Sequence, residues 1–199
     1  ISDGSAVLGL GNIGSYAALP VMEGKAVLFK EFGQVNAVPI CLDTQDTEDI
    51  IKTIVNIAPA FGGINLEDIS APRCFEIEER LKELLDIPAF HDDQHGTAIV
   101  VLAGIINALK VTGKQKDSCK VVVNGAGSAG IAIKKLLLTY GFSHITMCDI
   151  NGILSKNSPN LNYMQKYITE VTNLEEKEGT LADALCGADI FIGVSAPNI

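Results

Sequence analysis

The chain alternates short apolar runs, rich in β-branched residues, with amphipathic helical patterns. The runs SAVLGL, NAVPICLD, GINLEDI and IPAFHDD precede a polar linker at about residues 112–118, and KVVVNGAG then starts the alternation again. Strands that alternate with helices build βαβ units, in which helices cover both faces of a mostly parallel sheet. The sequence therefore predicts an α/β fold of two doubly wound parallel-sheet units, residues 1–112 and residues 117–199.

Two helical patterns are clear enough to place their ends. DTEDIIKTIVNIAP carries its isoleucines on one face, with Asp46 as the N-cap and Pro59 as the stop. RCFEIEERLKELLD has an apolar stripe and oppositely charged pairs spaced four residues apart. A third helix, from Thr97, lies within TAIVVLAGIINALKV. That run is too short to span a bilayer, so we expect a buried helix.

Composition limits the classes of function. The 199 residues are 47% hydrophobic, which suffices for a sizeable core, and the net charge is −9. Nucleic acids and anionic membranes attract clustered Lys and Arg, so we expect neither as a partner. The five cysteines are scattered without paired spacing, which favours free thiols in a reducing cytoplasm. Both ends look cut, so we expect a fragment in which both units are incomplete.

A glycine motif in the second unit has the full context of a dinucleotide site. In NGAGSAG, Gly125, Gly127 and Gly130 enclose Ser128 and Ala129, after the strand KVVV and before a helical pattern. Such a turn brings the backbone close to a pyrophosphate at a helix N-terminus. The next strand ends in Asp149, which can accept hydrogen bonds from an adenosine ribose. We predict a Rossmann-type cofactor unit, against the alternative that the glycines only permit close helix–sheet packing.

The same spacing occurs earlier, in GLGNIG, with glycines at positions 9, 11 and 14. Glu31 is a possible acidic partner, but Pro20 follows the last glycine closely and would clash inside a helix at a cost of about 3 kcal/mol. We therefore expect a short, kinked or displaced helix here. Our hypothesis is that the motif is a tight turn that leads the chain back to Lys25.

Two acidic pairs stand at the ends of predicted strands. Glu67 and Asp68 close GINLED, and Asp92 and Asp93 close IPAFHDD. Oxygen ligands converging from different segments are what Mg²⁺ or Mn²⁺ requires, although such pairs are often only solvated or helix-capping. Lys25 precedes a long apolar stretch, where desolvation would lower its pKa and suit it as a base. On the sequence alone, a surface lysine in a turn is the simpler interpretation.

These segments together resemble the NAD(P)-dependent malic enzymes in their compact bacterial form. The resemblance runs from about residue 3 to residue 198, and it is carried by DGSAVLGLGNIG, PVMEGKAVLF, FGGINLEDISAPRCFEIEERL, IPAFHDDQHGTAIV and VVNGAGSAG. It implies a substrate- and metal-binding first domain and an NAD-binding second domain. It also implies the oxidative decarboxylation of L-malate to pyruvate and CO₂, with reduction of NAD(P), in a cytoplasmic homodimer.

The resemblance also implies roles for single residues. Lys25 matches the base that takes the malate hydroxyl proton, and Asp92 matches the aspartate that tunes it. Glu67, Asp68 and Asp93 match the ligands of a divalent metal. Thr97, Val194 and Ser195 match segments near the nicotinamide. Asp149, with no nearby cation to accept a 2′-phosphate, favours NAD over NADP, although NADP stays possible.

Some positions depart from the family pattern. The tyrosine that protonates the enol lies in a YTPG-like segment that this sequence lacks, and substrate-binding asparagines would fall beyond Ile199. Ala6 stands where larger members carry an arginine, and Ser15 replaces an expected proline. The resemblance thus implies that this chain is not a competent enzyme by itself. A malolactic-type decarboxylation and a non-catalytic dinucleotide-binding module are the alternatives.

Overall fold

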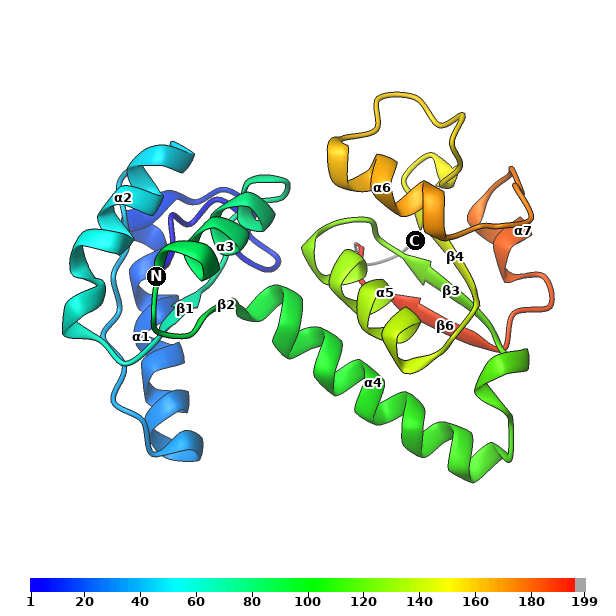
Figure 1. Cartoon of the computed structure of the whole chain (residues 1–199), viewed down its shortest axis with the longest axis horizontal. Coiled ribbons are helices and arrows are strands. Elements are labelled where there is room, and N and C mark those ends of the chain that lie inside the picture. The colour runs from blue at the N-terminus through cyan, green and yellow to red at the C-terminus, as the bar shows by residue number, and fades with distance from the viewer. Residues whose placement is uncertain (196–199) are drawn as a thin grey trace. The chain divides into compact units, whose positions relative to one another are not determined.

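The computed structural model describes residues 1–195, which form two compact units. The first is Ile1–Asp93, and the second starts at Gln94. The helix Asp92–Thr112 therefore begins in the first unit and continues in the second, and the predicted linker at 112–118 lies inside the second. Figure 1 labels the helices and most of the strands of both units along the chain.

The first unit is a small parallel sheet with three helices. Its elements are α1 (Gly14–Gly33), α2 (Thr47–Ile57), the 3₁₀ turn η1 (Ala58–Ala60), β1 (Ile64–Leu66), α3 (Arg73–Leu84) and β2 (Ala89–His91). β1 and β2 pair in parallel, from Ile64 opposite Ala89 to Leu66 opposite His91. α2 and α3 pack against each other, and α3 also contacts β2. The Asp46 side chain accepts from the Asp49 N–H, which confirms the predicted N-cap.

Two predicted strands of the first unit do not form. SAVLGL and NAVPICLD contribute only isolated bridges, Ser2 with Cys41 and Val7 with Gly11. Gly9 and Gly11 have φ values of +77° and +75°, which lie outside the extended region of a strand. The chain between them closes on itself, since the Val7 N–H donates to the Gly11 carbonyl at 3.0 Å. The apolar run SAVLGL therefore forms a turn and not a strand.

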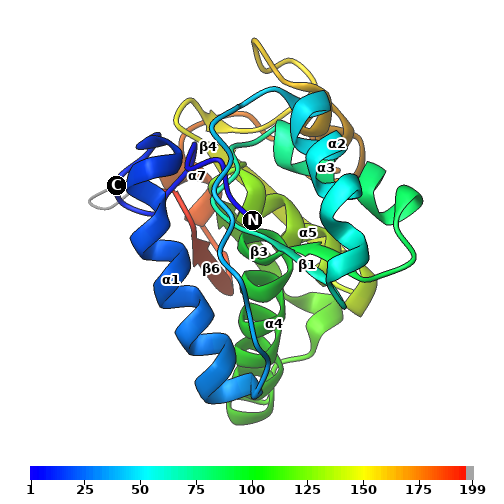
Figure 2. The same cartoon turned by 90° about the vertical axis from the view of Figure 1, so that its left-hand side faces the viewer.

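The helix after the first glycine motif is neither short nor displaced, so two of our three alternatives were wrong. α1 begins at Gly14 and continues through Pro20 for 20 residues. Pro20 lies on an exposed face, where water can hydrate the carbonyl that loses its N–H partner. Lys25 lies farther along this helix and not in a turn. After α1 an extended segment runs back along the helix toward the N-terminus (Figure 2).

The second unit contains a four-stranded sheet in the order β5-β4-β3-β6. Its elements after α4 (Asp92–Thr112) are η2 (Lys116–Ser118), β3 (Lys120–Asn124), α5 (Ser128–Tyr140), β4 (His144–Asp149), β5 (Gly152–Ile153), α6 (Tyr163–Val171), α7 (Leu181–Leu185) and β6 (Ile190–Gly193). β3 pairs in parallel with β4 and β6, and β5 is antiparallel to β4. The mixed α/β fold with parallel sheets is therefore confirmed.

Both faces of this sheet are covered. Val121, Val122 and Val123 are consecutive and all buried, as expected for a strand packed on two sides. Val122 packs with Cys148 and Ile153, and Leu181 of α7 lies against them. α5 also contacts β3. The β-branched run KVVV thus forms the central strand of a doubly wound sheet.

α4 is long and apolar, and most of its surface is exposed among the described residues. Gln94, Ala98 and Ile105 are its buried residues, so the expectation of a buried helix is not met there. By length and composition alone it also passes the test for a membrane span. That is weak evidence, because core helices pass the same test. Its first turn carries Asp92 and Asp93, which a bilayer interior disfavours.

Candidate active site

Lys25 lies among acidic side chains in the first unit. Its ammonium is 2.7 Å from Asp92 Oδ2 and 2.8 Å from Glu67 Oε1. Lys25 lies on α1, Glu67 directly follows β1, and Asp92 directly follows β2. Parallel strands bring their carboxyl ends to one edge of a sheet, so the two acidic pairs meet there. The two acidic pairs at the ends of the strands therefore lie together, although only two strands build the sheet.

The pKa of Lys25 moves in the direction opposite to the one we expected. Burial alone would lower it, but the hydrogen bonds and charges of Asp92 and Glu67 outweigh that effect and raise the pKa above its usual value. The sequence showed the apolar surroundings of Lys25 and not its two acidic partners. In this structure Lys25 is a firmly held ammonium.

The acidic side chains around Lys25 are crowded. Burial, and then the charges of Asp93 and Glu67, raise the pKa of Asp68 to about 7. Burial is also the largest cause that raises the pKa values of Glu67 and Asp93. One ammonium faces four carboxyl groups, so this edge of the sheet has an excess of negative charge. A cation is the ligand that would relieve it.

The residue types fit a divalent metal, but their atoms do not converge on one point. Among residues 1–195, no group of three or more His, Cys, Asp or Glu side chains is arranged to hold a metal ion. Asp93 accepts from the backbone N–H of Asp68 at 2.9 Å, and Glu67 is engaged by Lys25 and by Asn65 Nδ2 at 2.8 Å. The fit of Glu67, Asp68 and Asp93 to Mg²⁺ or Mn²⁺ therefore rests on oxygen donors and unbalanced charge.

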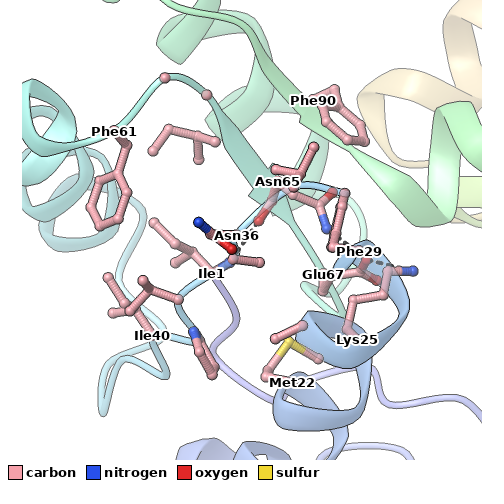
Figure 3. Close-up of a pocket in the computed structure, with 18 of the residues that line it drawn as sticks. Ile1, Met22, Lys25, Phe29, Asn36, Ile40, Phe61, Asn65, Glu67 and Phe90 are labelled. Atoms are coloured by element: carbon pink, nitrogen blue, oxygen red, sulfur yellow. Dashed lines mark hydrogen bonds and ion pairs between the residues drawn. The ribbon is translucent and has the colours of Figure 1, made fainter. Parts of the chain in front are cut away.

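A cavity of about 420 Å³ adjoins the cluster within the first unit. Lys25, Glu67 and Asn65 line one part of it, and Phe29, Phe61 and Phe90 contribute apolar walls (Figure 3). Asn65 is a residue that we did not predict. The signal was available, since residues two apart on a strand share a face and Asn65 precedes Glu67 by two positions.

The second glycine motif forms a strand-to-helix turn in the second unit. A Cβ on Gly130 would lie 1.8 Å from the Gly125 carbonyl oxygen, and a Cβ on Gly125 would lie 2.7 Å from the Val194 carbonyl oxygen. These two glycines allow the helix to pack closely on the sheet. A Cβ on Gly127 would meet nothing within 4 Å, so that residue faces open space. The turn thus serves close packing and also leaves room beside its middle glycine.

The amides of this turn are available to an anion. α5 has no side-chain cap, and its first turn starts at Ser128. The earliest helical bond of α5 is from the Ile131 N–H to the Gly127 carbonyl, so within residues 1–195 Ser128, Ala129 and Gly130 have no carbonyl partner for their N–H groups. Free amides at the positive end of a helix suit a phosphate.

The other predicted cofactor residues are also in the second unit. Asp149 ends β4, beside the glycine turn, where the Gly125 N–H donates to the Cys148 carbonyl at 2.9 Å. Val194 and Ser195 follow β6, and Asn124 Nδ2 donates to Ser195 Oγ at 3.0 Å. Thr97 is half-buried on α4. The turn, Asp149 and Ser195 therefore gather at the carboxyl ends of neighbouring strands.

The first glycine motif uses its amides internally. The N–H groups of Leu10 and Gly11 both donate to the Val7 carbonyl, and those of Ile13 and Gly14 both donate to the Gly4 carbonyl. These bonds are 2.8 to 3.1 Å long. Gly11 and Gly14 therefore have their N–H groups paired within the unit, which agrees with the interpretation of the motif as a turn.

Comparisons with known proteins cover nearly the whole chain. The model for the malic enzyme N-terminal domain matches residues 1–52 and 44–82, and the model for the malic enzyme NAD-binding domain matches residues 94–198. The NAD-dependent malic enzyme of Geobacillus stearothermophilus is 62% identical over 100% of this chain and 42% of its own length. The bifunctional malic/malolactic enzyme of Bacillus subtilis is 58% identical over 98% and 48%.

A solved structure agrees with these sequences. The crystal structure of the NAD-dependent malic enzyme from Thermotoga maritima matches with a TM-score of 0.96 and 56% identity, over 99% of this chain and 53% of the other. The chain therefore spans about half the length of these three relatives.

Proposed function

The chain belongs to the malic enzyme family, and from that premise we propose that it carries the catalytic lysine and most of the residues that bind the metal and the cofactor in L-malate oxidation. The reaction is the oxidative decarboxylation of L-malate to pyruvate and CO₂, with transfer of the C2 hydride to NAD. One observation supports this proposal above the others. Lys25 is held by Asp92 and Glu67, next to Asp68 and Asp93, at one edge of the sheet.

In this proposal Lys25 accepts the proton of the malate C2 hydroxyl, and Asp92 holds the lysine in place. Both Asp92 and Glu67 raise the pKa of Lys25. Neutralising the charge of Glu67 would therefore lower that pKa toward the range of a general base. Lys25 also lines the cavity of the first unit, where a small dicarboxylate would have access to it.

Glu67, Asp68 and Asp93 would hold Mg²⁺ or Mn²⁺. The metal would supply Lewis acidity, which lowers the pKa of a hydroxyl and polarises the ketone that follows. The three carboxylates contribute negative charge at a point where Lys25 alone does not balance it. The enol left by loss of CO₂ needs a proton at C3, and by family resemblance that acid is a tyrosine outside this sequence.

Gly125, Gly127 and Gly130 would bind the cofactor pyrophosphate at the start of α5. The free amides of Ser128, Ala129 and Gly130 would donate to its oxygens. Asp149 would accept from the adenosine ribose, and Thr97, Val194 and Ser195 would lie near the nicotinamide. An acid at this place repels a 2′-phosphate, which supports NAD over NADP. Relatives of both kinds are named, since the NADP-dependent malic enzyme of Rhizobium meliloti is 49% identical.

The test is NADH production from L-malate by the intact protein, with Mn²⁺ and with EDTA. We expect turnover with Mn²⁺ and none with EDTA. No turnover in either condition would refute the activity, and equal turnover in both would refute the metal requirement. Analytical ultracentrifugation of the same sample would test the predicted homodimer.

A malolactic reaction is the second candidate, because one relative at 58% identity is named as a bifunctional malic/malolactic enzyme. It would yield lactate and CO₂ from L-malate, with no net accumulation of NADH. Lactate and NADH assayed in one reaction separate the two. NADH without lactate supports the oxidative reaction alone.

A further inference from the structure

Arg73 forms the centre of a partly buried polar network in the first unit. Its Nη1 donates to Asp3 Oδ2 at 2.8 Å and to the Gln45 carbonyl at 2.7 Å. Its Nη2 donates to Ser5 Oγ at 2.9 Å and to Ser70 Oγ at 3.0 Å. The Asp3 side chain has an exposed fraction of 0%, so the arginine compensates a fully buried carboxylate. Arg73 thus joins three separate segments of the chain.

The network fixes the N-terminal segment that Arg73 contacts. Ser5 Oγ donates to Asp3 Oδ1 at 2.6 Å, and the Ser5 N–H donates to the same oxygen at 3.0 Å. Ser5 Oγ also accepts from the Ser70 N–H at 2.9 Å. Together with Arg73 these partners use the hydrogen-bonding capacity of the hydroxyl. Ser5 therefore has one orientation, and Arg73 helps to set it.

This segment in turn holds the loop that presents Asp68. The Ala6 N–H donates to the Asp68 carbonyl at 2.9 Å, and Ser70, two residues later, is held by Ser5 and Arg73. Asp68 has φ = +55°, in the left-handed region that a non-glycine residue adopts only when its surroundings enforce it. The bonds at the Asp68 carbonyl and at Ser70 provide that enforcement.

We propose that Arg73 is a positioning residue for the metal-binding carboxylates, acting through Ser5, Ser70 and Asp3 on the backbone of Asp68. The inference rests on the proposed metal site of Glu67, Asp68 and Asp93. Arg73 contacts none of these three side chains. A guanidinium is suited to this role, because its planar fork reaches four acceptors at once, whereas a lysine ammonium keeps the charge without the fork.

Arg80 gives a matched control on the same helix. It is near the other end of α3 and pairs with Glu48 and Glu76, and its side chain is 35% exposed. Its partners belong to α2 and α3, and none lies in the loop after β1. Arg80→Lys therefore makes the same chemical change and leaves the Asp68 loop alone.

The experiment measures Mn²⁺ affinity by electron paramagnetic resonance of free Mn²⁺, on the intact protein without substrate. Arg73→Lys should weaken Mn²⁺ binding by about 10- to 100-fold, the usual cost of losing a residue that orients metal ligands. Arg80→Lys should change it by less than about twofold, as for an exposed ion pair. NAD affinity serves as an internal reference and should stay the same in both variants.

A second variant guards against general unfolding. Asp3→Asn/Arg73→Gln removes the buried charge pair together, so no lone charge is left buried, and it should show the same loss of Mn²⁺ affinity with NAD affinity kept. Wild-type Mn²⁺ affinity in either folded variant would overturn the positioning role. If the wild-type protein binds no Mn²⁺, the proposed metal site fails, and the positioning role fails with it.

Discussion

The same glycine spacing occurs twice in this chain and does two different things. In the first motif the N–H groups of Gly11 and Gly14 are bonded to nearby carbonyls, and the helix that follows carries Lys25. In the second motif the N–H of Gly125 is bonded to the Cys148 carbonyl, but the N–H groups of Ser128, Ala129 and Gly130 in the first helical turn have no such partner among the described residues. Spacing alone therefore does not make a phosphate site. What also matters is which N–H groups of the turn the rest of the unit already uses.

The two motifs also use glycine for different reasons. The first has φ values between +75° and +77° at all three glycines, with open space around each. The second needs Gly130 because the Gly125 carbonyl fills the position of a side chain. Conformation explains the first set, and close approach explains Gly125 and Gly130 of the second. The effects of substitutions at the two motifs should therefore differ in size and in the property that they change.

The largest effect is expected from Gly130→Ala. The added Cβ would overlap backbone at 1.8 Å, so α5 must move away from the sheet. We expect a loss of more than about 3 kcal/mol in unfolding free energy and loss of NAD binding. Gly104→Ala, with open space on α4, is the control and should be neutral or stabilising. Urea unfolding measures both, and a stable Gly130→Ala variant would contradict the close-approach explanation.

Lys25→Ala should confine its effect to the first unit. Removal of a general base lowers the rate of malate oxidation by about 10²- to 10⁴-fold, while NAD affinity stays unchanged. Lys30→Ala, on the exposed part of the same helix, where Lys30 donates to Asn36, is the control. Steady-state kinetics and NAD titration separate the two quantities. A normal rate in Lys25→Ala would show that Lys25 is not the general base.

The acidic cluster should also make the metal-free protein sensitive to pH. The pKa of Asp68 is raised to about 7 in the folded protein, so protonation of this side chain stabilises the folded state relative to the unfolded state. This contribution to the unfolding free energy is complete below pH about 4, the pKa of aspartate in the unfolded chain, and it is lost as pH rises through about 7. With EDTA, unfolding free energy should fall by about 1–3 kcal/mol between pH 4 and pH 8, and Asp68→Asn should flatten this change. An equal slope in both proteins would exclude Asp68 as the source.

The sequence predicted more of the second unit than of the first. KVVV and HITMCD are β-branched or apolar runs whose pattern survives in the sheet, and their glycine turn has one standard geometry. In the first unit SAVLGL has strand composition, but positive φ at its glycines turns the chain back. The expected effect of Pro20 on the helix was too large, because an exposed helix face tolerates a proline.

Within the site, the sequence identified the acidic residues and missed what holds them. The acids at the ends of GINLED and IPAFHDD meet because their strands are parallel neighbours. The hydrogen bonds of Asn65 to Glu67 and of Arg73 to Asp3 depend on tertiary packing that no local pattern reports. The raised pKa of Lys25 has the same origin, since Asp92 lies 67 residues away in sequence.

The most direct test of the comparison is NAD binding to Gly127→Ala and Gly11→Ala, measured by isothermal titration calorimetry. Neither added Cβ meets protein within 4 Å, so steric unfolding is not expected in either. Gly11→Ala should cost about 1 kcal/mol of stability through its positive φ and leave NAD affinity unchanged. Gly127→Ala should fold normally and lose at least about tenfold in NAD affinity, because the methyl group occupies the pyrophosphate approach. Unchanged affinity in Gly127→Ala, or a loss in Gly11→Ala, would contradict the assignment of NAD to the second motif alone.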